Sequence, residues 1–380
     1  MDSLPLVRKL SRGLEASWAA GMLSRPTLEP RALLEEAGLG QPGSLQGGDW
    51  REGFALLTGD LIRDAKLNPL GRTIAHGQLV AILRQRSRAA SLWQRFPAIL
   101  EEPVPAPVVV LGHMRSGTTR LHRMLACDPR FSFTRLHETL APVAPSRTRS
   151  VVSASLLQSF LKFCNPQLGR IHPTSALAAE EEFGLHAFSF HGAMFEAQWK
   201  VPRFAAFCEQ RDVAEVYAEF RRLVQTLRWR RSERKDKVQL LKAPQFMQEV
   251  RAVLDAFPEA RIVWVRRDLG EVAASSASLV WHQRRIQSDA VDRVEIGREW
   301  LRKTQLRERR ASDALSEQRA ATLVVDYSAM NLDWQSEIRR IYRFLGFELS
   351  PAVVERMSRV AGTSAHKGHL YSSQQFGLDT

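Results

Sequence analysis

A strand-like apolar run that passes directly into a glycine-bounded turn is the feature that most constrains how this chain can fold. Residues 108–111 are all apolar and three of them are β-branched, which predicts a buried strand. Gly112 and Gly117 bracket the turn that follows, and a helix is predicted from Thr118 onward. Strand, turn and helix in this order direct free backbone N–H groups and the positive end of a helix dipole at one place. The stretch therefore predicts an anion-binding site.

The spacing of this turn is that of a nucleotide phosphate-binding loop, with one large difference. Thr118 stands where the lysine of a Walker motif would stand, and the cation of the loop is instead Arg115. A kinase uses that lysine and a magnesium ion to neutralise a multiply charged phosphoryl group. A sulfuryl group carries less charge, so hydrogen bonds and one well-placed cation are enough to move it. An ordinary strand–turn–helix junction that binds no ligand is the structural alternative.

Further apolar runs predict the sheet to which this first strand belongs. They lie at 238–241, 262–265 and 322–325, and the continuous apolar character of 262–265 suits a parallel strand covered on both faces. We expect an α/β fold: a P-loop-like central parallel sheet of four to five strands with helices on both faces. Residues 1–104 are expected to form a helical N-terminal extension and residues 105–380 the main domain. The proline-rich segment 101–107 marks the boundary.

A second motif follows the apolar run 262–265. Arg267 comes just after the run, and Ser275 lies eight residues later, on the next predicted helix. A guanidinium fork and a hydroxyl are donors that suit a phosphate dianion. Together with RSGTT at 115–119, this motif resembles the sulfotransferases that use 3′-phosphoadenosine 5′-phosphosulfate (PAPS), in their bacterial and tyrosylprotein or Golgi-like type. The resemblance covers residues 105–378.

The resemblance implies a donor and the residues that hold it. PAPS would give its sulfuryl group to a hydroxyl acceptor by metal-independent in-line transfer and leave as adenosine 3′,5′-bisphosphate. The loop would hold the phosphosulfate and stabilise the developing charge, through Arg115, Ser116, Gly117, Thr118 and Thr119. Arg267 and Ser275 would bind the 3′-phosphate, with Lys367 and Gly368 of the C-terminal tail as further donors. Lys242, at the end of the run 238–241, opens a KAP element similar to the family's KSP or KDP.

Glu138 is expected to be the base that accepts the proton of the attacking hydroxyl. Glu138 precedes a threonine, as the catalytic glutamate of tyrosylprotein-type sulfotransferases does, although the spacing from the loop is two residues longer here. His137 and Glu181 remain alternatives for this role. Glu181 and Glu182 belong to an EEF element similar to one that lies beside the acceptor pocket in bacterial members, or they simply begin a helix.

Composition limits the partners. Lys and Arg outnumber Asp and Glu by 54 to 41, a net charge of +13, which suits an anionic ligand. Three scattered cysteines and the lack of a long apolar run predict a soluble cytoplasmic chain without a transmembrane segment. No metal-ligand spacing is present, and the basic run 228–237 is too short and mixed in sign to predict nucleic-acid binding. The acceptor is expected to be a hydroxyl of a small molecule, a lipid or a glycan.

Two other functions are compatible with parts of the sequence. A metal-dependent P-loop nucleotide kinase would share the fold, but it predicts a lysine in the loop and a carboxylate that binds magnesium. A non-catalytic protein that binds a nucleotide or a nucleic acid would use the basic surface alone.

Overall fold

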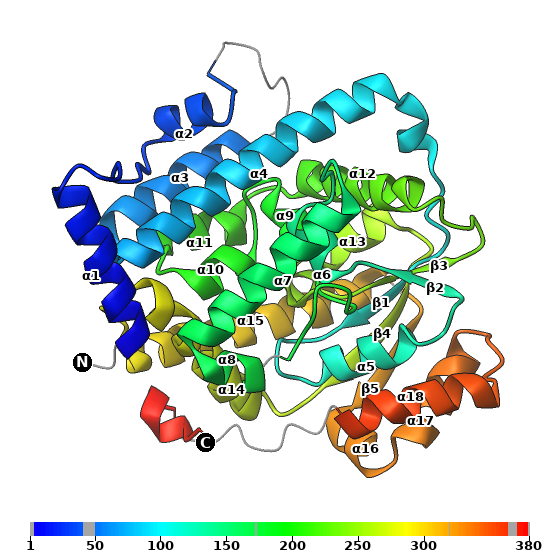
Figure 1. Ribbon diagram of the computed structural model, residues 1–380. Coiled ribbons are helices and arrows are strands. Elements are labelled where there is room, and N and C mark those ends of the chain that lie inside the picture. Colours follow the sequence, from blue (N-terminus) through cyan, green and yellow to red (C-terminus); the bar gives the residue numbers. More distant parts are fainter. Residues whose placement is uncertain (1–3, 41–49, 172, 319, 364–370, 379–380) are drawn as a thin grey trace.

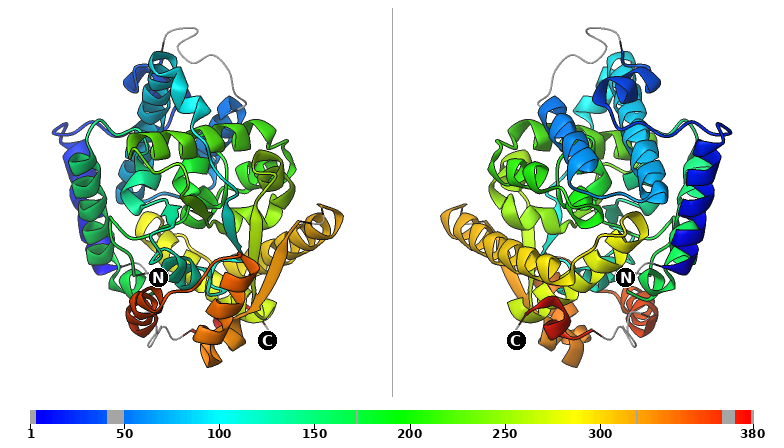
Figure 2. Two further views of the ribbon diagram at one scale, coloured as in Figure 1. Left: turned by 90° about the vertical axis from the view of Figure 1, so that its right-hand side faces the viewer. Right: turned by 90° about the vertical axis from the view of Figure 1, so that its left-hand side faces the viewer.

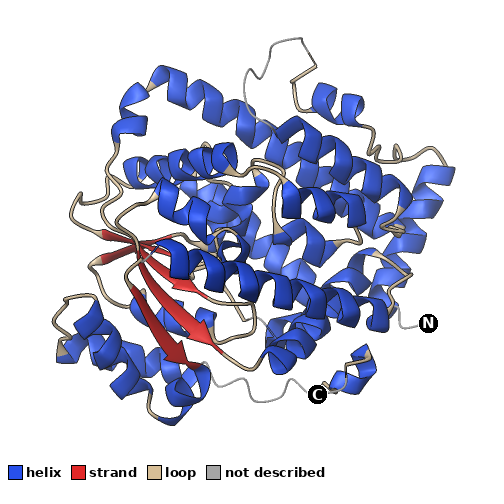
Figure 3. Ribbon diagram, turned by 180° about the vertical axis from the view of Figure 1, so that it is seen from behind, coloured by secondary structure: helices blue, strands red, loops and turns tan. Residues whose placement is uncertain are grey.

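A parallel sheet forms the centre of the molecule. The structure is a computed structural model that describes residues 4–40, 50–171, 173–318, 320–363 and 371–378. Within these residues, five parallel strands lie in the order β2–β3–β1–β4–β5 (Figures 1 and 3). Their bounds are β1 Val108–Leu111, β2 Phe131–Phe133, β3 Val238–Leu241, β4 Arg261–Arg266 and β5 Thr322–Asp326. Val108 lies opposite Leu240 on one side and Arg261 on the other, so β1 occupies the middle of the sheet.

Alternate side chains of the strands enter two separate cores, one on each face of the sheet. Val109 and Leu111 of β1 pack with apolar residues of α12 (Ala214–Arg230), α13 (Val250–Ala256) and α15 (Arg293–Gln318). Val108 and Val110 pack on the opposite face, with α5 (Thr118–Leu125), α17 (Trp334–Phe344) and α18 (Pro351–Thr363). Continuous apolar strands are required here because both faces exclude water. The predicted class of fold is confirmed.

The N-terminal helices cover one end of the molecule and share a core with a later segment (Figures 1 and 2). They are α1 (Pro5–Ala19), α2 (Pro30–Glu36), α3 (Trp50–Arg63) and α4 (Pro69–Arg95), followed by the 3-10 helix η1 (Pro97–Glu101). Leu57 and Leu79 are fully buried in one cluster with Phe195 and Phe204. The expected helical extension is therefore present, and it is packed against residues 187–208. The boundary at residue 104 stays a prediction.

The remaining helices connect the strands. Between β2 and β3 lie α6 (Leu136–Leu140), α7 (Arg147–Cys164), α8 (Pro166–Ile171), α9 (Phe183–Ala187), α10 (Ala193–Gln198) and α11 (Pro202–Gln210). Later in the chain follow η2 (Pro244–Gln248), α14 (Leu269–Gln287), α16 (Tyr327–Leu332) and η3 (Ser373–Phe376). None of the helices within the described ranges combines the length and the apolar character needed to cross a bilayer.

Gly71 of α4 provides a test of how the N-terminal helices are attached. A Cβ at Gly71 would lie 2.1 Å from the carbonyl oxygen of Gln287 in α14, whereas a Cβ at Gly77 of the same helix would meet nothing within 4 Å. Gly71→Ala should therefore lower the free energy of unfolding by about 1–3 kcal/mol through overpacking. Gly77→Ala should raise it by about 0.5–1 kcal/mol, because alanine favours the helix. Urea unfolding of both variants measures the difference, and a Gly71→Ala protein as stable as Gly77→Ala would contradict the packing.

Candidate functional site

The loop after β1 adopts a conformation that ordinary residues avoid. Arg115 and Gly117 have φ angles of 71° and 92°, in the left-handed region. Ser116 fastens the turn, because its amide and its Oγ both donate to the carbonyl of His113, at 3.2 and 2.6 Å. A Cβ on Gly117 would lie 2.6 Å from the ring of Tyr327, so only glycine fits. The helix α5 starts at Thr118, immediately after the turn, as the sequence predicts.

The loop and the end of β4 meet through two arginines. Arg267 donates to the carbonyl of Arg115 at 2.9 Å, and its guanidinium lies 4.3 Å from the centre of the Tyr327 ring. Arg115 in turn donates through Nε to the hydroxyl of Ser275 at 3.1 Å and through NH1 to the carbonyl of Ile171 at 2.9 Å. The structure thus brings together Arg115, Arg267 and Ser275, which the sequence assigned to donor binding from two distant motifs.

The electrostatic setting of Arg115 suits an anion. Burial lowers the pKa of Arg115, the phenols of Tyr371 and Tyr327 oppose this effect, and Arg267 reinforces it. Its hydrogen-bond partners are a hydroxyl and a carbonyl, and no carboxylate of the described residues lies at ion-pair distance. Glu271 pairs with Arg267, whereas the hydrogen-bond partners of Arg115 are neutral, and an anion bound beside Arg115 would relieve the repulsion between the two cations.

A third cation, Lys242, lies on the other side of the loop. It follows β3, which neighbours β1 in the sheet, and its side chain is only 1% exposed. Its Nζ donates to Oγ1 of Thr119 at 3.0 Å and forms an ion pair with Glu181. Burial and the charge of Lys242 lower the pKa of the nearby His122 to about 3, so that imidazole is neutral. The sequence indicates the KAP element but assigns no role to Lys242. Because β1 and β3 are neighbouring strands, the residue that follows β3 lies beside the loop that follows β1, and this strand order would have identified Lys242 as a site residue.

Glu182 is buried behind Glu181 and carries its own hydrogen bond to the same segment. Its Oε2 accepts from the backbone N–H of Lys242 at 2.8 Å. Burial raises the pKa of Glu182 to about 8, and the Lys242 amide and the Thr134 hydroxyl oppose the rise only in part. Glu182 is therefore mainly protonated at neutral pH, while Glu181 faces the ammonium of Lys242. Glu181 and Glu182 thus lie beside Lys242, and their role at the acceptor pocket stays a prediction.

Glu138 has a different environment. Arg231 holds both oxygens of its carboxylate, at 2.8 and 2.5 Å, and Arg135 contacts it through backbone and side chain. These cations keep the pKa of Glu138 below its usual value although burial acts the other way. His137 is buried and its Nδ1 lies 3.0 Å from Oγ of Ser150. The contacts of Glu138 are those of a residue that caps α6 and binds it to α12.

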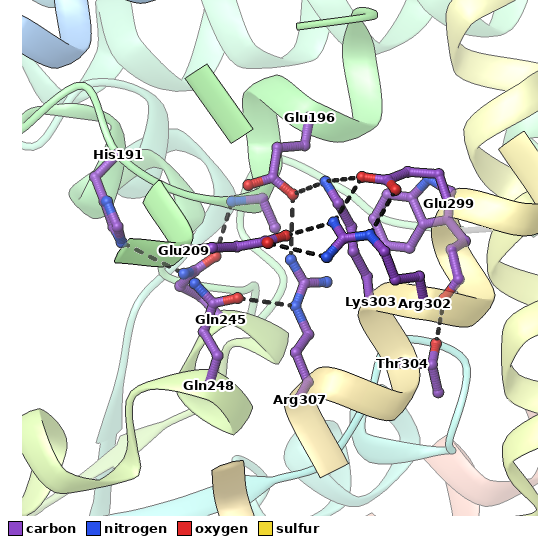
Figure 4. A network of polar contacts seen from close by, with 12 residues as sticks. His191, Glu196, Glu209, Gln245, Gln248, Glu299, Arg302, Lys303, Thr304 and Arg307 are labelled. Atoms are coloured by element: carbon purple, nitrogen blue, oxygen red, sulfur yellow. Dashed lines mark hydrogen bonds and ion pairs between the residues drawn. The ribbon is translucent and has the colours of Figure 1, made fainter. Parts of the chain in front are cut away.

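A buried polar network holds the segment that follows Lys242 (Figure 4). Glu196 of α10 pairs with Lys303 at 2.5 Å and with Arg307 at 3.2 Å, both on α15. Arg307 also donates to Gln248 of η2 at 3.2 Å, and the amide of Ala193 donates to Gln245 at 2.8 Å. Because η2 starts two residues after Lys242, these contacts fix the backbone from which Lys242 extends.

Two further expectations concern the C-terminal tail and the binding of metal ions. Lys367 and Gly368 lie outside the described residues, so their assignment stays a prediction. Among the residues that the structure does describe, no group of three or more His, Cys, Asp or Glu side chains is arranged to hold a metal ion.

The comparisons with known proteins identify the class. Residues 107–351 match the model of the sulfotransferase family. Over 299 residues the chain is 24% identical to the omega-hydroxy-beta-dihydromenaquinone-9 sulfotransferase Stf3 of Mycobacterium bovis and to that of Mycobacterium tuberculosis, covering 70% of this chain and 71% of theirs. This chain belongs to the sulfotransferase family, as its motifs indicated, and is an enzyme that transfers sulfuryl groups.

Two solved structures share the fold. One is the sulfotransferase STF1 of Mycobacterium tuberculosis, with a TM-score of 0.76 at 24% identity over 93% of this chain and 97% of that one. The other is the sulfotransferase STF9 of Mycobacterium avium, with a TM-score of 0.78 at 22% identity over 92% of this chain and 91% of that one. Both likenesses extend over nearly the whole chain and thus include the N-terminal helices.

The buried carboxyl of Glu182 predicts a pH-dependent stability. Its pKa of about 8 in the folded chain lies above its ordinary value of 4.5, so its contribution is full below about pH 4.5 and is lost as the pH rises through 8. The parent should lose up to about 1.4 kcal/mol per pH unit relative to Glu182→Gln across this window. Urea unfolding between pH 5 and 9 measures the difference. Glu215→Gln, at an exposed position of α12, is the control, and a parallel course of parent and Glu182→Gln would contradict the assignment.

Proposed function

We propose that this sulfotransferase takes its sulfuryl group from PAPS without a metal ion and transfers it to the hydroxyl of a lipid. The observation that carries the donor assignment is the group formed by Arg115, Arg267 and Ser275 beside a left-handed loop at a helix N-terminus. PAPS supplies two anionic groups, a 5′-phosphosulfate and a 3′-phosphate, together with the sulfuryl group that is transferred. The loop and the Arg267–Ser275 motif would each bind one of these two anionic groups.

The residues of the loop fit the phosphosulfate end of the donor. Free N–H groups at the start of α5 and the hydroxyls of Thr118 and Thr119 are donors for an anion at this point. Arg115 and Lys242 lie on either side of the loop and would stabilise negative charge as it develops on the sulfuryl and bridging oxygens. Thr118 in place of the Walker lysine supports metal-independent transfer, because here Lys242 approaches from the next strand instead.

Arg267 and Ser275 fit the 3′-phosphate end. Arg267 projects from the end of β4, and Ser275 lies on α14, which begins with an Asp268 side chain that accepts from the amide of Glu271 at 2.9 Å. Glu271 also pairs with Arg267 at 2.6 Å, which orients the guanidinium. A guanidinium so held loses little freedom on binding phosphate, and that supports its role as the anchor.

We assign the role of base to Glu181 rather than to Glu138 or His137. Glu138 is held at both oxygens by Arg231, which leaves its charge compensated and its lone pairs occupied. Glu181 shares the ammonium of Lys242 with Thr119, so it lies beside the loop at which sulfur would be attacked. An anion bound at Lys242 would compete with Glu181 for the ammonium and free the carboxylate to accept the hydroxyl's proton.

The acceptor assignment rests on the relatives. The name of Stf3 describes a hydroxylated menaquinone derivative as its acceptor, and this chain is similar to Stf3 over 70% of its length. A lipid hydroxyl is therefore the acceptor that we propose among the lipid, glycan and small-molecule alternatives.

Donor binding tests the first part of the proposal. Arg267→Ala should weaken binding of adenosine 3′,5′-bisphosphate about tenfold to a hundredfold, since a lost hydrogen bond to a charged group costs about 1.5–3 kcal/mol. Isothermal titration calorimetry in EDTA measures the affinity. Arg251→Ala, which removes an exposed arginine paired with Glu317, is the control. Equal affinities of Arg267→Ala and parent would contradict the site, and binding that requires Mg²⁺ would favour a P-loop kinase.

Turnover tests the base. Glu181→Gln should lower kcat about 10²–10⁴-fold, because glutamine keeps the shape of the side chain but takes no proton. The assay uses radiolabelled PAPS with a hydroxylated menaquinone as acceptor, and the affinity for adenosine 3′,5′-bisphosphate should stay near that of the parent. Glu138→Gln is the matched variant: it should lower the free energy of unfolding and leave kcat near that of the parent. If Glu138→Gln abolishes turnover while Glu181→Gln keeps more than about a third of it, the base is Glu138.

A further inference from the structure

Helix α7 presents an unpartnered apolar face to solvent. Val152, Leu156 and Phe163 are 51%, 65% and 68% exposed. They lie four and seven residues apart, so at about 100° per residue they fall within roughly 40° of one another around the helix. Single exposed leucines are ordinary on protein surfaces, but a row of large apolar side chains on one helix face marks an interaction site.

Two further exposed leucines lie on elements next to α7. Leu140 at the end of α6 is 40% exposed and Leu177 is 50% exposed. Helix α6 packs on α7, and the amide of His137 in α6 donates to the carbonyl of Ala176 at 3.1 Å. Both leucines therefore belong to the surroundings of α7.

The charge of the segment that carries the apolar face has one sign. Between Thr139 and Ala179 the chain contains no Asp or Glu, and its exposed cations are Arg147, Arg149, Lys162 and Arg170. Helix α1 lies beside α7, as the left view of Figure 2 shows, and its apolar side packs with Phe160 and Leu161. The exposed residues of α1 add Arg8, Lys9 and Arg12 against a single acid, Glu15.

We propose that the α7 face docks this enzyme on the surface of an anionic lipid membrane. An apolar helix face flanked by lysine and arginine is suited to lie in the plane of the interface, with its apolar side chains among the acyl chains and its cations at anionic headgroups. A second copy of the chain is a poorer occupant, because two surfaces of the same positive sign would meet. A nucleic acid would match the cations and leave the apolar row exposed.

The docking face adjoins the loop. The helix α8 follows α7 after a single residue, and its last residue, Ile171, accepts the hydrogen bond from Arg115. Docking would therefore hold the loop close to a lipid whose hydroxyl emerges at the interface. The docking itself rests on the exposed face alone; that it serves delivery of the acceptor rests on the proposed function.

Vesicle binding tests the docking. The full chain is sedimented with vesicles of phosphatidylcholine, and with vesicles in which about a third of the lipid is phosphatidylglycerol. The parent should bind the anionic vesicles, lose affinity as salt is raised, and bind the neutral ones weakly. Leu156→Ser combined with Phe163→Ser should weaken binding at least about tenfold, since two apolar anchors no longer enter the interface. Leu332→Ser, at a leucine 91% exposed on α16, is the matched control and should bind as the parent does.

Two further measurements make the result decisive. The double variant should melt near the parent temperature and should bind adenosine 3′,5′-bisphosphate with the parent's affinity, because neither residue touches the donor residues. Equal vesicle binding by the double variant and the parent overturns the proposal. So does a parent dimer in solution that the double variant loses, which would assign the face to a second copy. If the parent binds vesicles but does not bind adenosine 3′,5′-bisphosphate, the proposed donor is overturned and the docking proposal stands.

Discussion

The burial of two cations at the carboxyl edge of the sheet is the constraint around which the rest of the structure is arranged. Lys242 is fully buried and Arg115 half-buried, on either side of one loop. Burying a charge is unfavourable unless a partner compensates it. Lys242 has Glu181, whereas Arg115 has neutral partners and a neighbouring Arg267. The fold therefore creates an excess of positive potential where a parallel sheet presents helix N-termini, and an anionic donor such as the proposed one would offset that cost on binding.

Keeping these cations in place requires rigid support from elements distant in sequence. Arg267 fastens the carbonyl of Arg115 from β4, and His113 of the loop contacts Glu308 of α15 at 3.0 Å. The same helix supplies Lys303 and Arg307 to the buried network that secures η2 behind Lys242. One long helix thus supports both sides of the loop. A site built on such supports keeps its donors aimed without reorganising when charge develops.

Much of this arrangement could be predicted from the sequence, and the parts that could not share a physical reason. Strands β1, β4 and β5 contain three or four consecutive apolar residues and β3 is apolar apart from Gln239, whereas β2 has three residues with Ser132 in the middle and pairs, among the described strands, with β3 alone. The RSGTT and Arg267–Ser275 motifs end strands that are neighbours, so their meeting followed from the fold. The partner of Glu138, Arg231, is 93 residues away and that of Glu181 is 61 away. No local pattern reveals which carboxylate an arginine holds and which one faces a lysine.

The distribution of charge bears both on the proposed binding of the donor and on the proposed docking to a membrane. Glu138 and Glu180 delimit a segment without acids, and that segment contains both α7 and the Ile171 carbonyl that Arg115 binds. An acid on this segment would lower the positive potential at the loop and also repel an anionic surface. In the two proposals, the same absence of acids would therefore favour both the binding of the donor and the docking on the membrane. Because exposed charges are screened within about 10 Å at ordinary salt, the contribution to the loop comes mainly from residues near Ile171, and the contribution to docking from the exposed cations of α7 and α1.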